Sequence, residues 1–65
     1  MKNTIFIKGF KQYPKNYEVV VGIGEDCPDS QKGLITVLRA STKQEAKAAV
    51  KEKHPEVYIF DVYRI

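Results

Sequence analysis

Apolar residues cluster in short runs along this chain, and their spacing predicts four strands and one helix. The expected strands are segments 4–7, 17–23, 34–39 and 57–63. In the second segment one face is expected to carry Tyr17, Val19, Val21 and Ile23, and the other, partly polar face Glu18, Val20 and Gly22. This alternation is typical of a strand with one buried face. The third and fourth segments are apolar on both faces.

Strict alternation in the last segment divides its side chains into two sets. Val57 and Ile59 are expected on one face, and the side chains of Tyr58, Phe60 and Val62 on the other. Asp61 is the next residue on the face of Val57 and Ile59, so the C-terminal end of that face is expected to lie nearer to water.

A helix is predicted over Lys43–Lys53, where alanine, glutamate, lysine and glutamine dominate. Thr42 and Glu45 fit a capping box, in which Thr42 accepts from the Glu45 amide and Glu45 reaches back. A start one residue earlier, at Ser41, is the alternative. Pro55 ends the helix. The apolar stripe of this helix is small and consists of Ala46, Ala49 and Val50.

These elements predict one α+β domain over residues 1–65, a two-layer β-β-β-α-β sandwich. One helix would pack on one face of a mostly antiparallel sheet. The segment 24–33, with its glycines, proline and aspartates, is expected to be a loop. Its acidic residues lack the spacing of a calcium loop.

One helix covers one face of a sheet, so the other face is expected to carry uncovered apolar side chains. The uncovered set would be drawn from Phe6, Leu34, Leu38, Tyr58, Phe60 and Val62. Burying each such side chain is worth roughly 1.5–3 kcal/mol. Three arrangements would cover them: the N-terminal segment with Phe10 and Tyr13 folds over, two copies associate by face or edge, or the face binds something else.

The size of the chain makes association attractive. A domain of 65 residues has a small core and is marginally stable without additional support. Cys27 is the only cysteine, which excludes an internal disulfide, and no Cys/His cluster offers a metal site. No signal peptide and no membrane span are expected, so the interpretation is a cytoplasmic protein.

Catalytic chemistry has no candidate in the sequence. Cys27 lies in an acidic loop beside Pro28, and His54 lies at a helix end, so both are interpreted as structural residues. No set of serine, histidine and aspartate suggests a nucleophile. We therefore expect no enzymatic activity, no cofactor and no metal.

The charge is modest, at +3 with a pI near 9.1, but it is uneven. The first 17 residues hold four lysines and no acidic residue. Interleaved lysines and aromatic rings suit single-stranded nucleic acid. Residues expected to bind it are Lys8, Lys11, Lys15 and Tyr13. A solvated strand edge, where lysines prevent aggregation, is the structural alternative. Lys43, Lys47 and Lys51 form a second basic ridge on the helix, interpreted as a solvated face.

The sequence therefore favours a small interaction or assembly module that binds itself or a protein partner through an apolar sheet face. The expected anchors are Phe6, Phe10, Tyr58 and Phe60. A nucleic-acid-binding domain is the alternative function. In its size, basic charge and lack of a site, the chain is similar to small accessory proteins of phages and mobile elements.

Overall fold

The computed structural model describes residues 3–65. Its elements in chain order are β1 (Asn3–Phe6), β2 (Lys15–Gly22), the 3-10 turn η1 (Asp29–Gln31), β3 (Gly33–Ala40), α1 (Lys43–Lys53) and β4 (Tyr58–Arg64). Each lies within two residues of its expected range, except η1, which the sequence patterns do not predict.

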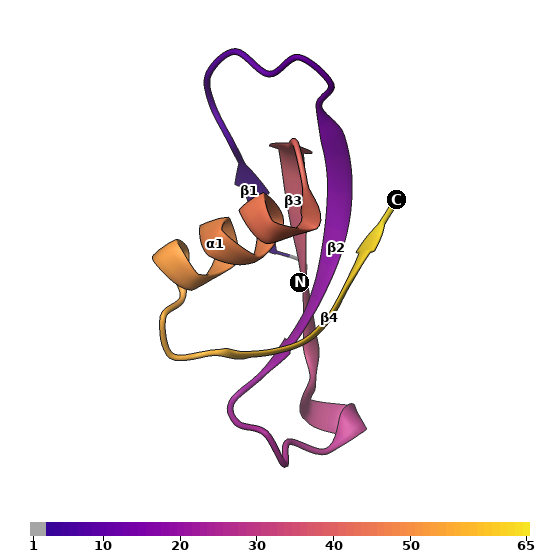
Figure 1. The fold of residues 1–65 in the computed structure, drawn as a ribbon. Helices are drawn as coiled ribbons and strands as arrows, with labels where there is room; N and C mark the ends of the chain where they lie inside the picture. The colour runs from indigo at the N-terminus through magenta and orange to yellow at the C-terminus, as the bar shows by residue number, and fades with distance from the viewer. Residues whose placement is uncertain (1–2) are drawn as a thin grey trace.

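The strands form one mixed sheet in the order β1-β3-β2-β4. β1 is parallel to β3, whereas β2 is antiparallel to both of its neighbours. The helix lies on one side of this sheet (Figure 1) and contacts β2, β3 and β4. The predicted α+β arrangement, with one helix packed on a mostly antiparallel sheet, is confirmed.

The core lies between the helix and the sheet. Ala46 and Val50 of the helix are fully covered, while Ala49 of the predicted stripe is half-buried. The sheet residues buried beneath them are Ile5, Tyr17, Val19, Val21, Ile35, Val37, Ala40 and Val62. Because the helix side chains are small, the helix can approach the sheet closely.

The helix begins as the sequence predicts. Thr42 accepts a hydrogen bond of 3.1 Å from the Glu45 amide, and the Glu45 carboxylate accepts one of 2.5 Å from the amide of Ser41. The first bond satisfies an amide that the first helical turn leaves without a partner, and the second reaches the residue before Thr42 rather than the Thr42 amide of a strict capping box. His54 ends the helix, and its amide donates to the carbonyl of Val50 at 2.8 Å. Within residues 3–65, no helix is long and apolar enough to cross a membrane.

A bulge near the end of β3 changes which residues face the core. Tyr17 pairs with Val37 and Lys15 with Ala40, so β3 has one more residue here than β2. Arg39 has a φ of 67°, the left-handed conformation that admits an extra residue in a strand. Ala40 consequently faces the helix side of the sheet and is fully buried.

A second bulge corrects the expected alternation in the last strand. Val20 pairs with Asp61 and Val21 with Ile59, so Phe60 is the extra residue. The prediction that Val62 lies on the same face as Phe60 is wrong. Val62 is buried in the core, and Asp61 lies on the opposite face of the sheet. One inserted residue reverses the faces of all residues after it.

Candidate interaction surface

The candidate surface is the sheet face opposite the helix, which we call the open face. Strand alternation and the pairing register place eleven residues on it. They are Thr4, Phe6, Glu18, Val20, Gly22, Leu34, Thr36, Leu38, Tyr58, Asp61 and Tyr63. The open face thus combines apolar side chains with a central group of polar ones.

A polar row crosses the middle of the open face. The register aligns Thr4, Thr36, Glu18 and Tyr63 across all four strands. Thr36 donates from its hydroxyl to the Glu18 carboxylate at 2.8 Å, and both side chains are buried. This row therefore separates the apolar residues of the open face into two groups.

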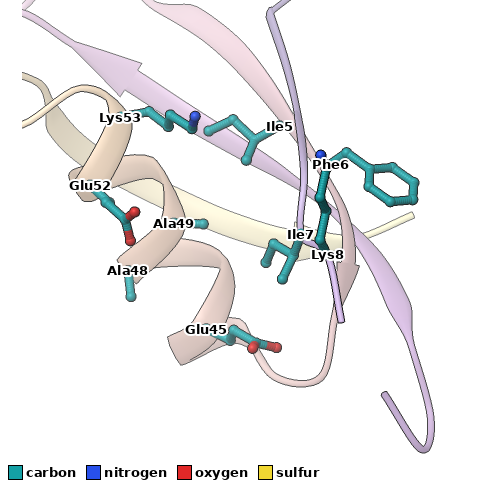
Figure 2. A pocket seen from close by; sticks show the side chains of 9 residues that line it. All are labelled: Ile5, Phe6, Ile7, Lys8, Glu45, Ala48, Ala49, Glu52 and Lys53. Atoms are coloured by element: carbon teal, nitrogen blue, oxygen red, sulfur yellow. The ribbon is translucent and has the colours of Figure 1, made fainter. Parts of the chain in front are cut away.

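The first apolar group lies at the corner where β1 ends. Phe6 pairs with Leu38 across the parallel ladder, and the Phe6 side chain is 57% exposed. Its ring points away from the helix side of β1 (Figure 2). Of the four predicted anchors, the structure places Phe6 and Tyr58 on the open face in edge strands, and Phe6 is the more exposed of these two.

The second group lies at the diagonally opposite corner and is already packed within the chain. The rings of Tyr58 and Phe60 meet edge to face with centroids 4.9 Å apart, and the Lys32 ammonium lies 4.1 Å from the centre of the Phe60 ring. A side chain at Gly22 would come within 2.7 Å of the same ring and 2.9 Å of Cys27. Phe60 is therefore half-buried, whereas Tyr58 stays exposed.

The η1 turn helps to hold Lys32 in this corner. Asp29 receives a hydrogen bond of 2.7 Å from the Lys32 ammonium, and the hydrogen bond and charge of Lys32 lower the pKa of the Asp29 carboxyl. The loop preceding β3 thus covers one end of the open face. The sequence signal for this contact was Cys27, an apolar residue within an otherwise polar loop.

The loop from Ile7 to Pro14 does not cover the open face. Phe10 is 93% exposed and Tyr13 is 71% exposed. The Lys11 ammonium forms an ion pair with Glu45 at the start of α1, and this contact lowers the pKa of the Glu45 carboxyl. Of the three arrangements expected to cover the apolar surface, folding of the N-terminal segment is wrong.

The predicted nucleic-acid residues are only partly brought together. Lys8 is exposed just after β1, and Tyr13 is exposed on the following loop. Lys11 is held by Glu45, and Lys15 is half-buried at the start of β2. The fourth lysine of this stretch, Lys2, lies outside the described residues.

The lysines of α1 are arranged as expected on an exposed face. Lys43 and Lys47 border a shallow groove of about 230 Å³ against β4. Lys51 donates to the carbonyl of Val57 at 2.5 Å and thereby holds the chain that follows the helix.

A larger groove of about 300 Å³ runs between β1 and the helix, and we call it the β1 groove. Its lining is Ile5, Phe6, Ile7, Lys8, Glu45, Ala48, Ala49, Glu52 and Lys53 (Figure 2). The two alanines leave space that larger side chains would fill. The sequence patterns did not predict this groove, because the pairing of β1 with β3 cannot be read from periodicity.

No group of three histidine, cysteine, aspartate or glutamate side chains that could hold a metal is present among residues 3–65. Cys27 is buried against Gly22. His54 lies at the end of the helix with a Glu56 carboxylate oxygen 4.0 Å from its Nδ1.

Comparison of the chain with protein-family models, curated proteins and solved structures gives no match.

Proposed function

We propose that this chain is a small non-enzymatic assembly module, and that it self-associates through the part of its sheet that the helix leaves uncovered. The exposure of Phe6 carries the proposal. A phenylalanine that is 57% exposed at the corner of a sheet forgoes much of the roughly 1.5–3 kcal/mol that burial of its ring would contribute. Leu34, Tyr58 and Tyr63 are also exposed on the same face.

The small core supports this proposal. Its three largest fully buried side chains are valines: Val19, Val37 and Val50. A domain with such a core gains a large fraction of its stability from any further apolar burial, and association with a second copy provides it.

The experiment is the molar mass in solution, measured by size exclusion with light scattering over a range of concentrations. We expect a dimer or larger species at tens of micromolar. Phe6→Lys should weaken the association, whereas Ile23→Lys should leave it unchanged, because Ile23 is an exposed apolar residue on a loop. A native chain that stays monomeric at every concentration would contradict the proposal.

Single-stranded nucleic acid is the second candidate ligand, favoured by the exposed rings of Phe10 and Tyr13 beside Lys8. Rings that are 93% and 71% exposed can stack on bases, and lysine neutralises phosphate. Fluorescence anisotropy with labelled single strands tests it. Binding should weaken steeply with salt and be reduced more by Lys8→Ala than by Lys47→Ala on the helix. Absence of binding at low salt would eliminate this candidate.

A further inference from the structure

At each edge of the sheet, some backbone amides and carbonyls point away from the neighbouring strand. The two edges differ in whether these groups are already protected. At the β4 edge, the Ile65 amide donates to the carbonyl of Asn16 at 3.0 Å. Hydrogen-bonded and non-hydrogen-bonded pairs alternate in an antiparallel ladder, so the amide of Val62 points away from β2. The Asp61 carboxylate accepts a hydrogen bond of 2.8 Å from that amide.

The β4 edge is therefore protected against pairing with another strand. The bulge at Phe60 interrupts the regular pairing pattern of β4. The Asp61 carboxylate accepts the hydrogen bond of the Val62 amide and adds a negative charge to the edge. Bulges and charges are two of the devices that keep sheet edges from pairing.

The β1 edge has no bulge and no such carboxylate, although the strand is four residues long and the exposed Lys8 lies just beyond it. The Ile7 amide donates to Leu38 of β3 at 3.0 Å, and successive residues of a strand direct their backbone groups to opposite sides. Thr4 and Phe6 therefore present their amides and carbonyls away from β3. The pairing of β1 with β3 is regular throughout Asn3–Phe6, without a bulge. This edge can accept another strand.

The β1 groove lies beside the β1 edge. The helix packs mainly on β2, β3 and β4, so β1 lies at the margin of the two-layer structure. Ile5 of β1 and Ile7 just after it line one side of the groove, and Ala48 and Ala49 of the helix line the other. The charged lining residues lie toward its two ends (Figure 2). Lys8 and Glu45 are at the end where β1 finishes, and Glu52 and Lys53 are at the other.

We propose that a second copy of this chain pairs with the β1 edge, antiparallel and about a twofold axis. Thr4 of each copy would lie opposite Phe6 of the other, and the two residues would exchange amide-to-carbonyl hydrogen bonds. Ile5 would face its counterpart across the axis. This inference rests on the proposed self-association and specifies its geometry.

The occupant is a second copy because the edge is self-complementary. A twofold axis pairs the same residues on both sides, so the outward groups of Thr4 and Phe6 all gain partners. The same axis brings opposite ends of the two β1 grooves together. Lys8 and Glu45 would then approach Glu52 and Lys53 of the second copy, so that each meeting point combines charges of both signs.

The pairing also accounts for the exposed ring of Phe6. The ring would cover Thr4 of the second copy and reach the other Phe6 diagonally, a separation that aromatic side chains bridge. The two sheets would join into one, with an apolar centre formed by the Phe6 and Leu38 side chains of both copies.

Thr4→Pro tests the hydrogen bonds of this interface. Proline at position 4 removes an amide that points away from β3, so the fold is retained, as circular dichroism would show. The dissociation constant of the dimer should rise at least about tenfold, because two intermolecular hydrogen bonds are lost and the ring obstructs the approach. Thr4→Val keeps the amide and is the matched control.

A cross-link tests the register independently, and it decides the matter if the proline variant does not fold. In a Cys27→Ser background, Ile5→Cys should form an intermolecular disulfide on mild oxidation, because Cβ atoms of such a pair lie about 4.5–5.5 Å apart. Ile23→Cys, on an exposed loop, should not.

The outcomes separate the two proposals. A native dimer that persists in Thr4→Pro and does not cross-link through position 5 overturns the β1 pairing and leaves self-association intact. A native chain that is monomeric at every concentration overturns both.

Discussion

Thr36 donates a hydrogen bond of 2.8 Å to Glu18, and both side chains are buried although they lie on the face of the sheet that no helix covers. A carboxylate in such surroundings depends on its hydrogen-bond donors. The pair also breaks the apolar character of the open face at its centre. An apolar partner would therefore find its best contacts at the corners, of which the Phe6 corner is the more exposed.

Replacing Thr36 tests what this hydrogen bond contributes. Thr36→Val preserves the shape of the side chain but removes the donor to Glu18, and should lower the free energy of unfolding by about 1–3 kcal/mol. Thr36→Ser keeps the hydroxyl and should lose less. Urea unfolding at neutral pH measures both. Equal stability of the valine variant and the native chain would show that the hydrogen bond contributes nothing net.

Gly22 is required by close packing on the open face. Gly22→Ala would place its Cβ 2.7 Å from Phe60 and 2.9 Å from Cys27, so the neighbours must shift. We expect a loss of about 1–3 kcal/mol in the free energy of unfolding. Gly33→Ala is the control, because no atom lies within 4 Å of its added Cβ. Similar effects at both glycines would refute the steric explanation.

The sequence predicted those elements whose signals are local. The helix bounds followed from Thr42 and Pro55, and β2 followed from the alternation of Tyr17, Val19 and Val21. The face of Val62 was mistaken, because periodicity does not reveal an inserted residue such as Phe60. A bulge is defined by the partner strand, and so depends on contacts between residues far apart in the chain.

The candidate site was less predictable than the fold, for the same reason. That Phe6 would lie at an open edge depends on the parallel pairing of β1 with β3, which the sequence does not specify. Phe60 was expected to be an exposed anchor, yet its ring is partly covered by Lys32 and packs against Tyr58. Exposure in a small domain is decided by loops as much as by strands.

Glu45 should make the stability of the domain depend on pH. The Lys11 ammonium and then the Ser41 amide lower its pKa below the ordinary value of 4.5. The folded chain therefore binds this proton less readily than the unfolded chain does. The resulting stability is fully present above pH 4.5 and is lost as the pH falls through the lower, folded-state pKa.

Glu45→Gln tests this linkage. At neutral pH it should lower the free energy of unfolding by up to about 1 kcal/mol, since the ion pair is partly exposed. The difference from the native chain should vanish in strong acid. Glu52→Gln, an exposed residue of the same helix, is the control. A difference for Glu45→Gln that does not change with pH would contradict the assignment.

Arg39 adopts a left-handed backbone conformation with a φ of 67°, which costs most residues about 1 kcal/mol or more. Arg39→Gly should therefore raise the free energy of unfolding by up to about 1 kcal/mol, although it removes a long contact of 3.4 Å from the guanidinium to the Gly9 carbonyl. Arg39→Val should lower it, because β-branched residues tolerate this conformation least. Thermal unfolding would rank the variants, and the reverse order would contradict the prediction.

Asp61 should prevent other strands from pairing with the β4 edge. Asp61→Ala frees the Val62 amide, and we expect species larger than those of the native chain at equal concentration, detected by light scattering. Asp26→Ala, an exposed aspartate on a loop, controls for the loss of one negative charge. Equal size distributions for the two variants would show that the edge is protected by the bulge rather than by the carboxylate.

The bulge at Arg39 also determines where the chain can become shorter. Tyr17 faces Val37 and Lys15 faces Ala40, so without Arg39 the two strands would match residue for residue, with Leu38 opposite Asn16. Val37 and Ala40 would still face the helix. Removal of one residue from the middle of β3, in contrast, would exchange the two faces of that strand between the deletion and the bulge. Natural variants of this chain that differ in length by one residue should therefore carry the gap at position 39.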